Sequence, residues 1–153
     1  MIKIIDIDSL LDEYISDYVY KNIGKVKPEE IENQINKLVI ENNFHINIEK
    51  INDNTLKLIS TGVAAHAAYP ELGVNSLSRL IILLNKLLTL HEIKIPIFNY
   101  IDTKINTTLN GELLNINCND ESGNLTLNIG NIKFENNTIK IGLNIRIPVT
   151  IYP

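Results

Sequence analysis

Hydrophobic residues recur at helical spacing in several stretches of the chain. One stretch covers residues 8–22 and predicts a helix that Asp8 would cap. Pro28 opens a second predicted helix, which extends to about Asn42, because proline is favoured at the first helical position. The longest helix is expected over about residues 74–90. Its apolar positions are Leu77, Leu80, Ile81, Leu84, Leu87 and Leu88.

Other segments alternate apolar and polar residues, which predicts strands. "FHINIEKI", residues 44–51, has this pattern, and "TLKLIS", residues 55–60, would return antiparallel to it after the turn "INDNT". A short helix is expected in residues 96–105. It would be followed by a further strand, "ELLNINC", residues 112–118. The inward positions of that strand would be Leu114, Ile116 and Cys118.

The last third of the chain contains a hairpin whose register can be derived. In "NLTLNIGNIKF" the apolar residues are odd-numbered up to Ile129 and even-numbered from Ile132, so the alternation slips at residues 130–131. A β-bulge produces such a slip. With a two-residue turn at residues 136–137 and the bulge opposite Gly142, the apolar residues of both strands share one face. The predicted pairs are Phe134–Ile139, Ile132–Ile141, Ile129–Leu143, Leu127–Ile145 and Leu125–Ile147.

The same register defines the polar face of the hairpin. It places Asn128 opposite Asn144 and Thr126 opposite Arg146, so that Asn128 and Arg146 are diagonal neighbours on an otherwise neutral surface. A guanidinium beside an amide is a suitable arrangement for binding a carboxylate. A lone arginine on a strand is more often a solvated surface charge, and the sequence leaves both interpretations open.

The stretch "STGVAAHAAYPELGVNSLSRL", residues 60–80, surrounds one histidine with small side chains. His66 lies between two pairs of alanines, follows Gly62 and precedes a Pro-Glu-x-Gly turn. Small neighbours allow another surface to approach the imidazole closely, which indicates a contact site. A hydrogen-bonded loop histidine with no such role fits the sequence equally well.

Composition narrows the class of protein. A length of 153 residues, with 44% hydrophobic and 21% charged residues, fits one globular domain. The net charge of −4, without a basic cluster, argues against nucleic acid or an anionic membrane as a partner. The single cysteine, Cys118, cannot form an internal disulfide, and the first residues carry acids where a signal peptide carries a basic end. We therefore expect a cytoplasmic protein.

No motif in the sequence builds a catalytic centre by itself. The three histidines lack a second ligand at a metal-binding spacing, and "NDESGN" lacks the spacing of a calcium-binding EF-hand loop. No G-x-S-x-G nucleophile motif or glycine-rich phosphate loop is present. His45, on a polar strand face, and His91, at a helix end, are interpreted as structural. No metal site is expected in this chain.

Two separate stretches resemble a known family. "TGVAAHAAYPELGVNSLSRL" resembles a G-x-x-A-H-A-x-x-P-E-x-G-x-N motif of the dinuclear-zinc metallopeptidases that include carboxypeptidase G, aminoacylase, carnosinase and succinyl-diaminopimelate desuccinylase. "SGNLTLNIG" followed by "IGLNIRIPV" is similar to paired strands of the bacterial PepV-type, or Xaa-His, dipeptidases. That subgroup usually has tyrosine where this chain has Ile147. The resemblance covers about residues 40–150.

In those enzymes the similar region is a lid, or dimerisation, domain inserted into the catalytic domain. The resemblance implies an α+β, ferredoxin-like fold with about four main antiparallel strands and helices on one face. Residues 28–153 are expected to form this lid, and residues 1–27 a separate N-terminal helical segment. Two zinc ions would lie in the catalytic domain of the parent enzyme, because this sequence has neither the H-x-D ligand motif nor the Asp-Glu-Glu base segment. The chain alone should therefore be inactive.

The resemblance also implies roles for three residues. His66 would donate a hydrogen bond to the oxyanion formed when the peptide bond of a dipeptide is cleaved. Arg146 would bind the C-terminal carboxylate of the substrate, and Asn128 would supply a polar contact nearby. The expected partners are the dipeptide, the catalytic zinc domain and, as in dimeric relatives, a second lid. The alternative is a free-standing dimerisation or small-ligand-binding module without a catalytic role.

Overall fold

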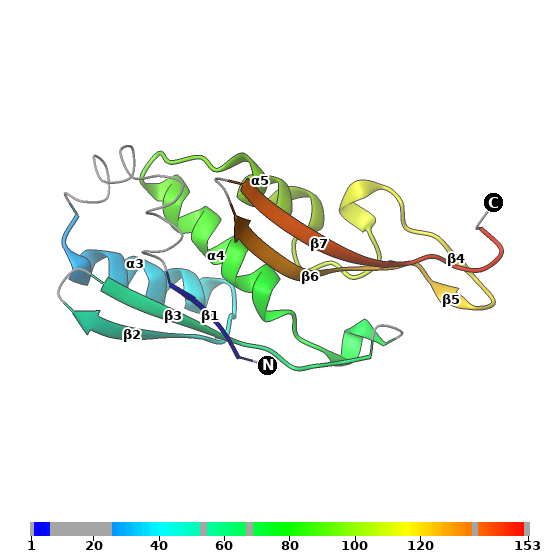
Figure 1. Cartoon of the computed structure of the whole chain (residues 1–153), viewed down its shortest axis with the longest axis horizontal. Helices are drawn as coiled ribbons and strands as arrows, with labels where there is room; N and C mark the ends of the chain where they lie inside the picture. The colour runs from blue at the N-terminus through cyan, green and yellow to red at the C-terminus, as the bar shows by residue number, and fades with distance from the viewer. Residues whose placement is uncertain (1, 7–25, 53–54, 67–68, 136–137, 152–153) are drawn as a thin grey trace.

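The computed structural model describes residues 2–6, 26–52, 55–66, 69–135 and 138–151. Within these ranges the chain combines α-helices with antiparallel strands, so the predicted α+β class is confirmed (Figure 1). The helix predicted at residues 8–22 lies outside the described residues. In the part of the chain that the structure describes, no helix is long and apolar enough to span a membrane.

The first sheet has the strand order β1-β3-β2 and is antiparallel throughout. Its strands are β1 (Ile2–Asp6), β2 (Ile46–Asn52) and β3 (Thr55–Thr61). The alternation predicted for β2 and β3 is confirmed, since Ile46, Leu56 and Leu58 are buried on one face. Residues 2–6, expected to belong to a separate N-terminal helical segment, instead form the strand β1 and pair with β3.

The central helix α4 (Ser76–Leu90) is buried on nearly all of its sides. It packs on the helix α3 (Pro28–Glu41), on β3 and on a later strand, β6 (Thr126–Glu135) (Figure 1). The six predicted apolar positions are all buried, and four residues outside that face are buried with them. These are Ser78, Ile82, Leu83 and Asn85.

The two long helices are also joined by a polar contact. His91, which caps the C-terminus of α4, places its Nε2 atom 2.7 Å from the side-chain oxygen of Gln34 on α3. This contact gives His91 the structural role that its position at a helix end predicted.

The segment between α4 and β6 is partly helical. The predicted short helix is α5 (Pro96–Tyr100), which continues as the π-helical turn η2 (Ile101–Ile105). The strand predicted at residues 112–118 is wrong: this segment contains the 3₁₀ turn η3 (Glu112–Leu114). Gly111 and Asn115 have φ angles of 72° and 56°, and this left-handed backbone interrupts an extended strand.

A side chain is also excluded at the first of these two positions. A Cβ atom on Gly111 would lie 2.6 Å from the side chain of Ile116. A two-residue hairpin, β4 (Asn119–Asp120) and β5 (Gly123–Asn124), then leads into β6.

The hairpin of β6 and β7 (Thr138–Arg146) has the register predicted from the sequence. The ladder shifts between Ile129 and Asn131, as the predicted bulge requires, and four of the five predicted apolar pairs are present. Leu125 precedes β6, so the fifth pair is not part of the ladder. The turn at residues 136–137 lies outside the described residues. The confirmed pairs are Phe134–Ile139, Ile132–Ile141, Ile129–Leu143 and Leu127–Ile145.

Two glycines make the close approach of β6 and β7 at this bulge possible. A Cβ atom on Gly130 would lie 2.7 Å from the Asn144 amide nitrogen, and one on Gly142 would lie 2.7 Å from the Asn131 amide nitrogen. Each strand therefore covers a glycine of the other strand with an asparagine side chain. This reciprocal packing explains why the alternation of apolar and polar residues along β6 shifts by one position at residues 130–131.

Candidate functional site

The His66 loop, residues 62–75, connects β3 to α4. Val63 and Val74 close its base through two backbone hydrogen bonds of 3.1 and 2.9 Å. Gly62 precedes this closure, and a Cβ atom on it would lie 2.5 Å from the carbonyl oxygen of Val74. Gly62 is therefore required by the backbone contact inside the loop. The sequence had indicated a different reason, namely that small residues here let another surface approach His66.

His66 is exposed and lies among exposed apolar side chains. The backbone amide of Tyr69 donates to the carbonyl of His66 at 2.8 Å, and the two rings are tilted with centroids 6.4 Å apart. Tyr69 and Leu72 are 59% and 70% exposed. A histidine surrounded by exposed apolar residues is typical of a surface that contacts another molecule.

Arg146 and Asn128 lie on one face of the β6–β7 hairpin, as predicted. Thr126 pairs with Arg146 and Asn128 with Asn144, and the Asn144 amide donates to Asn128 Oδ1 at 3.3 Å. Arg146 is exposed, and none of the carboxylates that the structure describes forms an ion pair with it. A guanidinium of this kind can pair with a carboxylate from outside the chain.

Asn75, for which no role was predicted, joins these two parts. Its side-chain oxygen accepts hydrogen bonds from the amides of Leu77 and Ser78 and so caps α4. Its amide nitrogen donates to the carbonyl of Ile129, the residue after Asn128, at 2.8 Å. The cap could have been recognised from an asparagine before an apolar helical run. The contact with β6 could not, because it joins residues distant in sequence.

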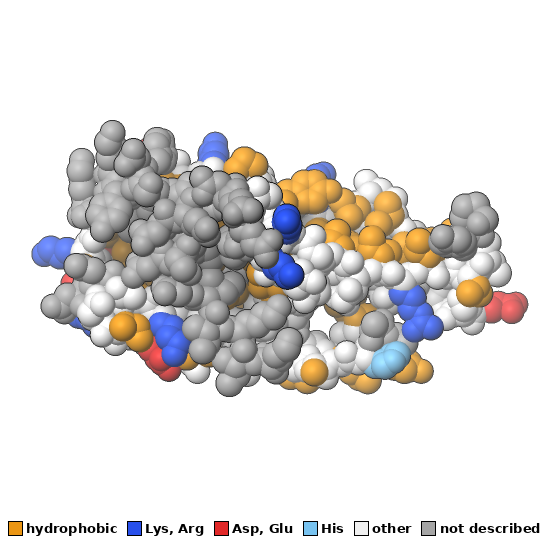
Figure 2. Space-filling view, in the orientation of Figure 1, with side chains coloured by type: hydrophobic (Ala, Val, Ile, Leu, Met, Phe, Trp, Pro, Cys, Tyr) orange, Lys and Arg blue, Asp and Glu red, His pale blue; other side chains and the backbone are white. Residues whose placement is uncertain are grey.

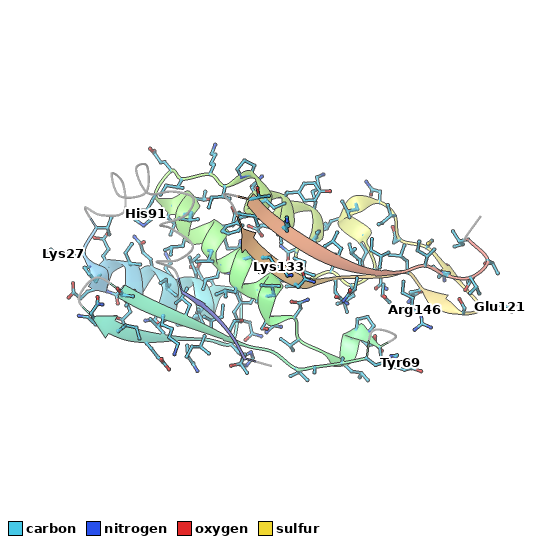
Figure 3. The ribbon with its side chains drawn as sticks, in the orientation of Figure 1. Lys27, Tyr69, His91, Glu121, Lys133 and Arg146 are labelled. Carbon is cyan, nitrogen blue, oxygen red and sulfur yellow. The ribbon has the colours of Figure 1, made fainter. Side chains whose placement is uncertain are left out.

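The His66 loop is therefore fixed to the strand that carries the polar face. In Figure 3 the side chain of Arg146 extends from the end of β7 toward the side of the molecule where Tyr69 lies. Imidazole, amide and guanidinium groups supply hydrogen-bond donors and one positive charge. Such a set can bind polar and anionic groups but does not break a bond by itself.

The described residues do not fit a metal centre. No group of three or more histidine, cysteine, aspartate or glutamate side chains lies together among them. His45 lies instead beside Arg79, with 3.5 Å between its Nδ1 atom and the guanidinium, and Arg79 stacks over Phe44. A dinuclear zinc site would need ligands from outside this part of the chain.

We expect the two functions of Asn75 to be separable by substitution. Asn75→Ala removes both the helix cap and the bond to Ile129, and should lower the free energy of unfolding by about 1 to 2 kcal/mol. Asn75→Ser keeps a capping hydroxyl that is too short to reach β6, and should recover about half of this loss. Urea unfolding followed by circular dichroism measures both values. A serine variant as stable as the original chain would show that the contact with β6 contributes nothing.

Comparison with known families identifies the family of the domain that carries these residues. The family model of the peptidase dimerisation domain, M20_dimer, matches residues 52–144. The match covers more than half of the chain and includes the His66 loop and Asn128, but it ends just before Arg146. A search of the curated proteins finds no match. Domains of this family occur in peptidases, which are hydrolases. The chain belongs to the M20 family of peptidase dimerisation domains.

Proposed function

We propose that the chain is the substrate-binding lid of a cytoplasmic, zinc-dependent dipeptidase. The observation that carries this proposal is the bond from Asn75 to Ile129, which fixes the exposed His66 loop to the hairpin with Arg146. Arg146 forms no ion pair with any described carboxylate. The fold family supports a peptidase context, and the resemblance of the His66 and Arg146 segments to PepV-type enzymes supports dipeptides as substrates. The two zinc ions would belong to a catalytic domain outside the described residues.

Each group of the site has a task in this proposal. His66 donates a hydrogen bond to the carbonyl oxygen that gains negative charge as the peptide bond is cleaved. Arg146 binds the C-terminal carboxylate with two parallel hydrogen bonds, and Asn128 adds a polar contact next to it. The exposed apolar residues Tyr69 and Leu72 pack against the catalytic domain when the lid closes, which excludes water from the site.

His66→Ala should lower kcat of the dipeptidase formed by this chain and its catalytic domain. Loss of one oxyanion donor typically costs about 100-fold to 1,000-fold in kcat, while substrate affinity changes little. Steady-state kinetics on a dipeptide measure the effect, and His45→Ala, which alters an exposed histidine just before β2, is the matched control. Equal activities of the His66 and His45 variants would contradict the proposed role and favour a module without catalytic function.

Arg146→Ala should raise KM instead. The loss of a charge-assisted pair with the substrate carboxylate should raise KM roughly 10-fold to 100-fold. Arg146→Lys should restore part of the affinity, since lysine keeps the charge but not the two-pronged geometry. A dipeptide with an amidated C-terminus is the control substrate, because it lacks the carboxylate. If the alanine variant loses as much affinity for the amide as for the free acid, Arg146 does not bind the carboxylate.

The family also suggests a second copy of the chain as a partner. Residues on β7 alternate between the two faces of the hairpin, so the row opposite Arg146 is apolar. Leu143, Ile145 and Ile147 in this row are all exposed, and Figure 2 shows hydrophobic side chains gathered over the region of β7. Among the described strands only β6 pairs with β7, so the edge of β7 away from β6 has no strand partner along residues 143–146. We propose this row and edge as the dimer surface.

Ile145→Lys should weaken the dimer without unfolding the chain. Ile145 is 51% exposed, so a charge is tolerated in the monomer but would be buried between two copies. The dimer dissociation constant from sedimentation equilibrium should rise roughly tenfold or more. Ile51→Lys, at a strand position that is 56% exposed on β2, is the matched control. The surface is assigned wrongly if the two variants associate equally well.

A further inference from the structure

The carboxylate of Asp120 has four hydrogen-bond donors although it lies at an exposed hairpin turn. Its Oδ1 atom accepts from the backbone amide and the hydroxyl of Ser122, at 2.6 and 2.5 Å. Its Oδ2 atom accepts from the backbone amide and the hydroxyl of Thr150, at 2.7 and 2.6 Å. Both oxygens are therefore occupied, and one of them binds a residue thirty positions further along the chain.

This contact fixes the segment that follows β7. The hydroxyl of Ser122 also accepts from the amide of Val149 at 3.2 Å, so the β4–β5 turn binds two consecutive backbone amides. Pro148 before them is buried, and the amide of Ile151 closes the turn by donating to the carbonyl of Pro148 at 3.2 Å. The chain between residues 148 and 151 is thereby held against the β4–β5 hairpin.

Arg146 lies between two points of attachment. It is the last residue of β7, where its backbone pairs with Thr126. The β4–β5 turn holds the chain again three residues later, where Ser122 accepts from the amide of Val149, and Asp120 accepts from the next amide, that of Thr150. Ile147 and Pro148 are the only residues between them, and proline restricts the backbone further. The backbone from which the guanidinium extends is consequently fixed on both sides.

We propose that Asp120 is a positioning residue for Arg146, holding the guanidinium where the carboxylate of a substrate binds. This inference rests on the proposed function, and it adds a residue that does not itself touch the substrate. In Figure 3 Glu121, the neighbour of Asp120, lies at the end of the molecule beyond Arg146. Asp120 acts through the backbone, because its oxygens are bound to Ser122 and Thr150 and not to the guanidinium.

The same hydrogen bonds keep Asp120 in its acceptor form. Those from the hydroxyls of Ser122 and Thr150, followed by the amide of Thr150, hold the pKa of the Asp120 carboxyl well below its ordinary value of 3.8. Because the pKa is lower in the folded state than in the unfolded state, the contact is fully formed at pH values above 3.8. It is lost only when the pH falls through the pKa of the folded state. At the neutral pH of an assay Asp120 is ionised and accepts all four bonds.

Asp120→Asn tests the proposal. Whichever way the new amide is turned, its nitrogen cannot accept, so two of the four donors lose their acceptor. In the dipeptidase formed with the catalytic domain, we expect KM to rise roughly fivefold to twentyfold while kcat stays within about a factor of two. Glu121→Gln removes the same charge one residue away and should leave both constants unchanged. Thr150→Val, a milder change at the same contact, should raise KM in the same direction.

Two controls connect the effect to Arg146. The rise in KM caused by Asp120→Asn should disappear for a dipeptide with an amidated C-terminus. In the Arg146→Ala background, Asp120→Asn should cause no further rise in KM, because the two residues act on one contact. In this chain alone, hydrogen exchange at the Val149 and Thr150 amides should become about tenfold faster in Asp120→Asn than in Glu121→Gln. This readout does not depend on peptidase activity.

The outcomes separate this inference from the proposed function. If Arg146→Ala leaves KM unchanged, the proposed function is wrong, whatever Asp120 does. If Arg146→Ala raises KM and Asp120→Asn does not, the positioning role is overturned. An equal rise in KM for Asp120→Asn and Glu121→Gln would also overturn it, since the effect would then come from charge alone.

Discussion

The burial of α4 is the constraint on which the rest of the structure depends. This helix packs against β3 on one side and β6 on another, and its side chains are buried almost around its whole circumference. Because a close-packed core resists small displacements, the first sheet and the β6–β7 hairpin hold fixed positions relative to the helix. The His66 loop ends at the N-terminus of α4, where Asn75 caps the helix and binds β6. A loop with exposed apolar side chains is thus positioned by a core to which it contributes little.

The sequence predicts the features of this fold that follow from side-chain periodicity. The register of β6 and β7 could be derived because a shift of one residue would move every apolar side chain to the opposite face. Only a bulge at residues 130–131 keeps both apolar rows together, and the structure has it there. The false strand at residues 112–118 shows the limit of the same reasoning. Its alternating pattern was genuine, but Gly111 and Asn115 adopt a left-handed backbone that periodicity does not reveal.

The side chains proposed for the site follow from local patterns, and the contacts that support them do not. His66 was proposed from its small neighbours, and Arg146 and Asn128 from a strand face that the structure shows them to share. Asn75 belongs to the same motif as His66, yet its bond to Ile129 joins parts of the chain separated by 54 residues. Contacts between distant loops follow from the packed core and not from local spacing, so they become visible only in the folded chain.

The alternation of side chains along β7 lets one strand serve two surfaces. Arg146 and Asn144 lie on the polar face, and Leu143 and Ile145 lie on the apolar face, although all four share one short length of backbone. The pairing of Arg146 with Thr126 fixes this backbone on one side. The hydrogen bond from Thr150 to Asp120 fixes it on the other side. A partner that packs on the apolar row therefore contacts the same backbone that carries the guanidinium. The apolar row proposed for association and the guanidinium proposed for carboxylate binding are therefore carried by one stretch of backbone.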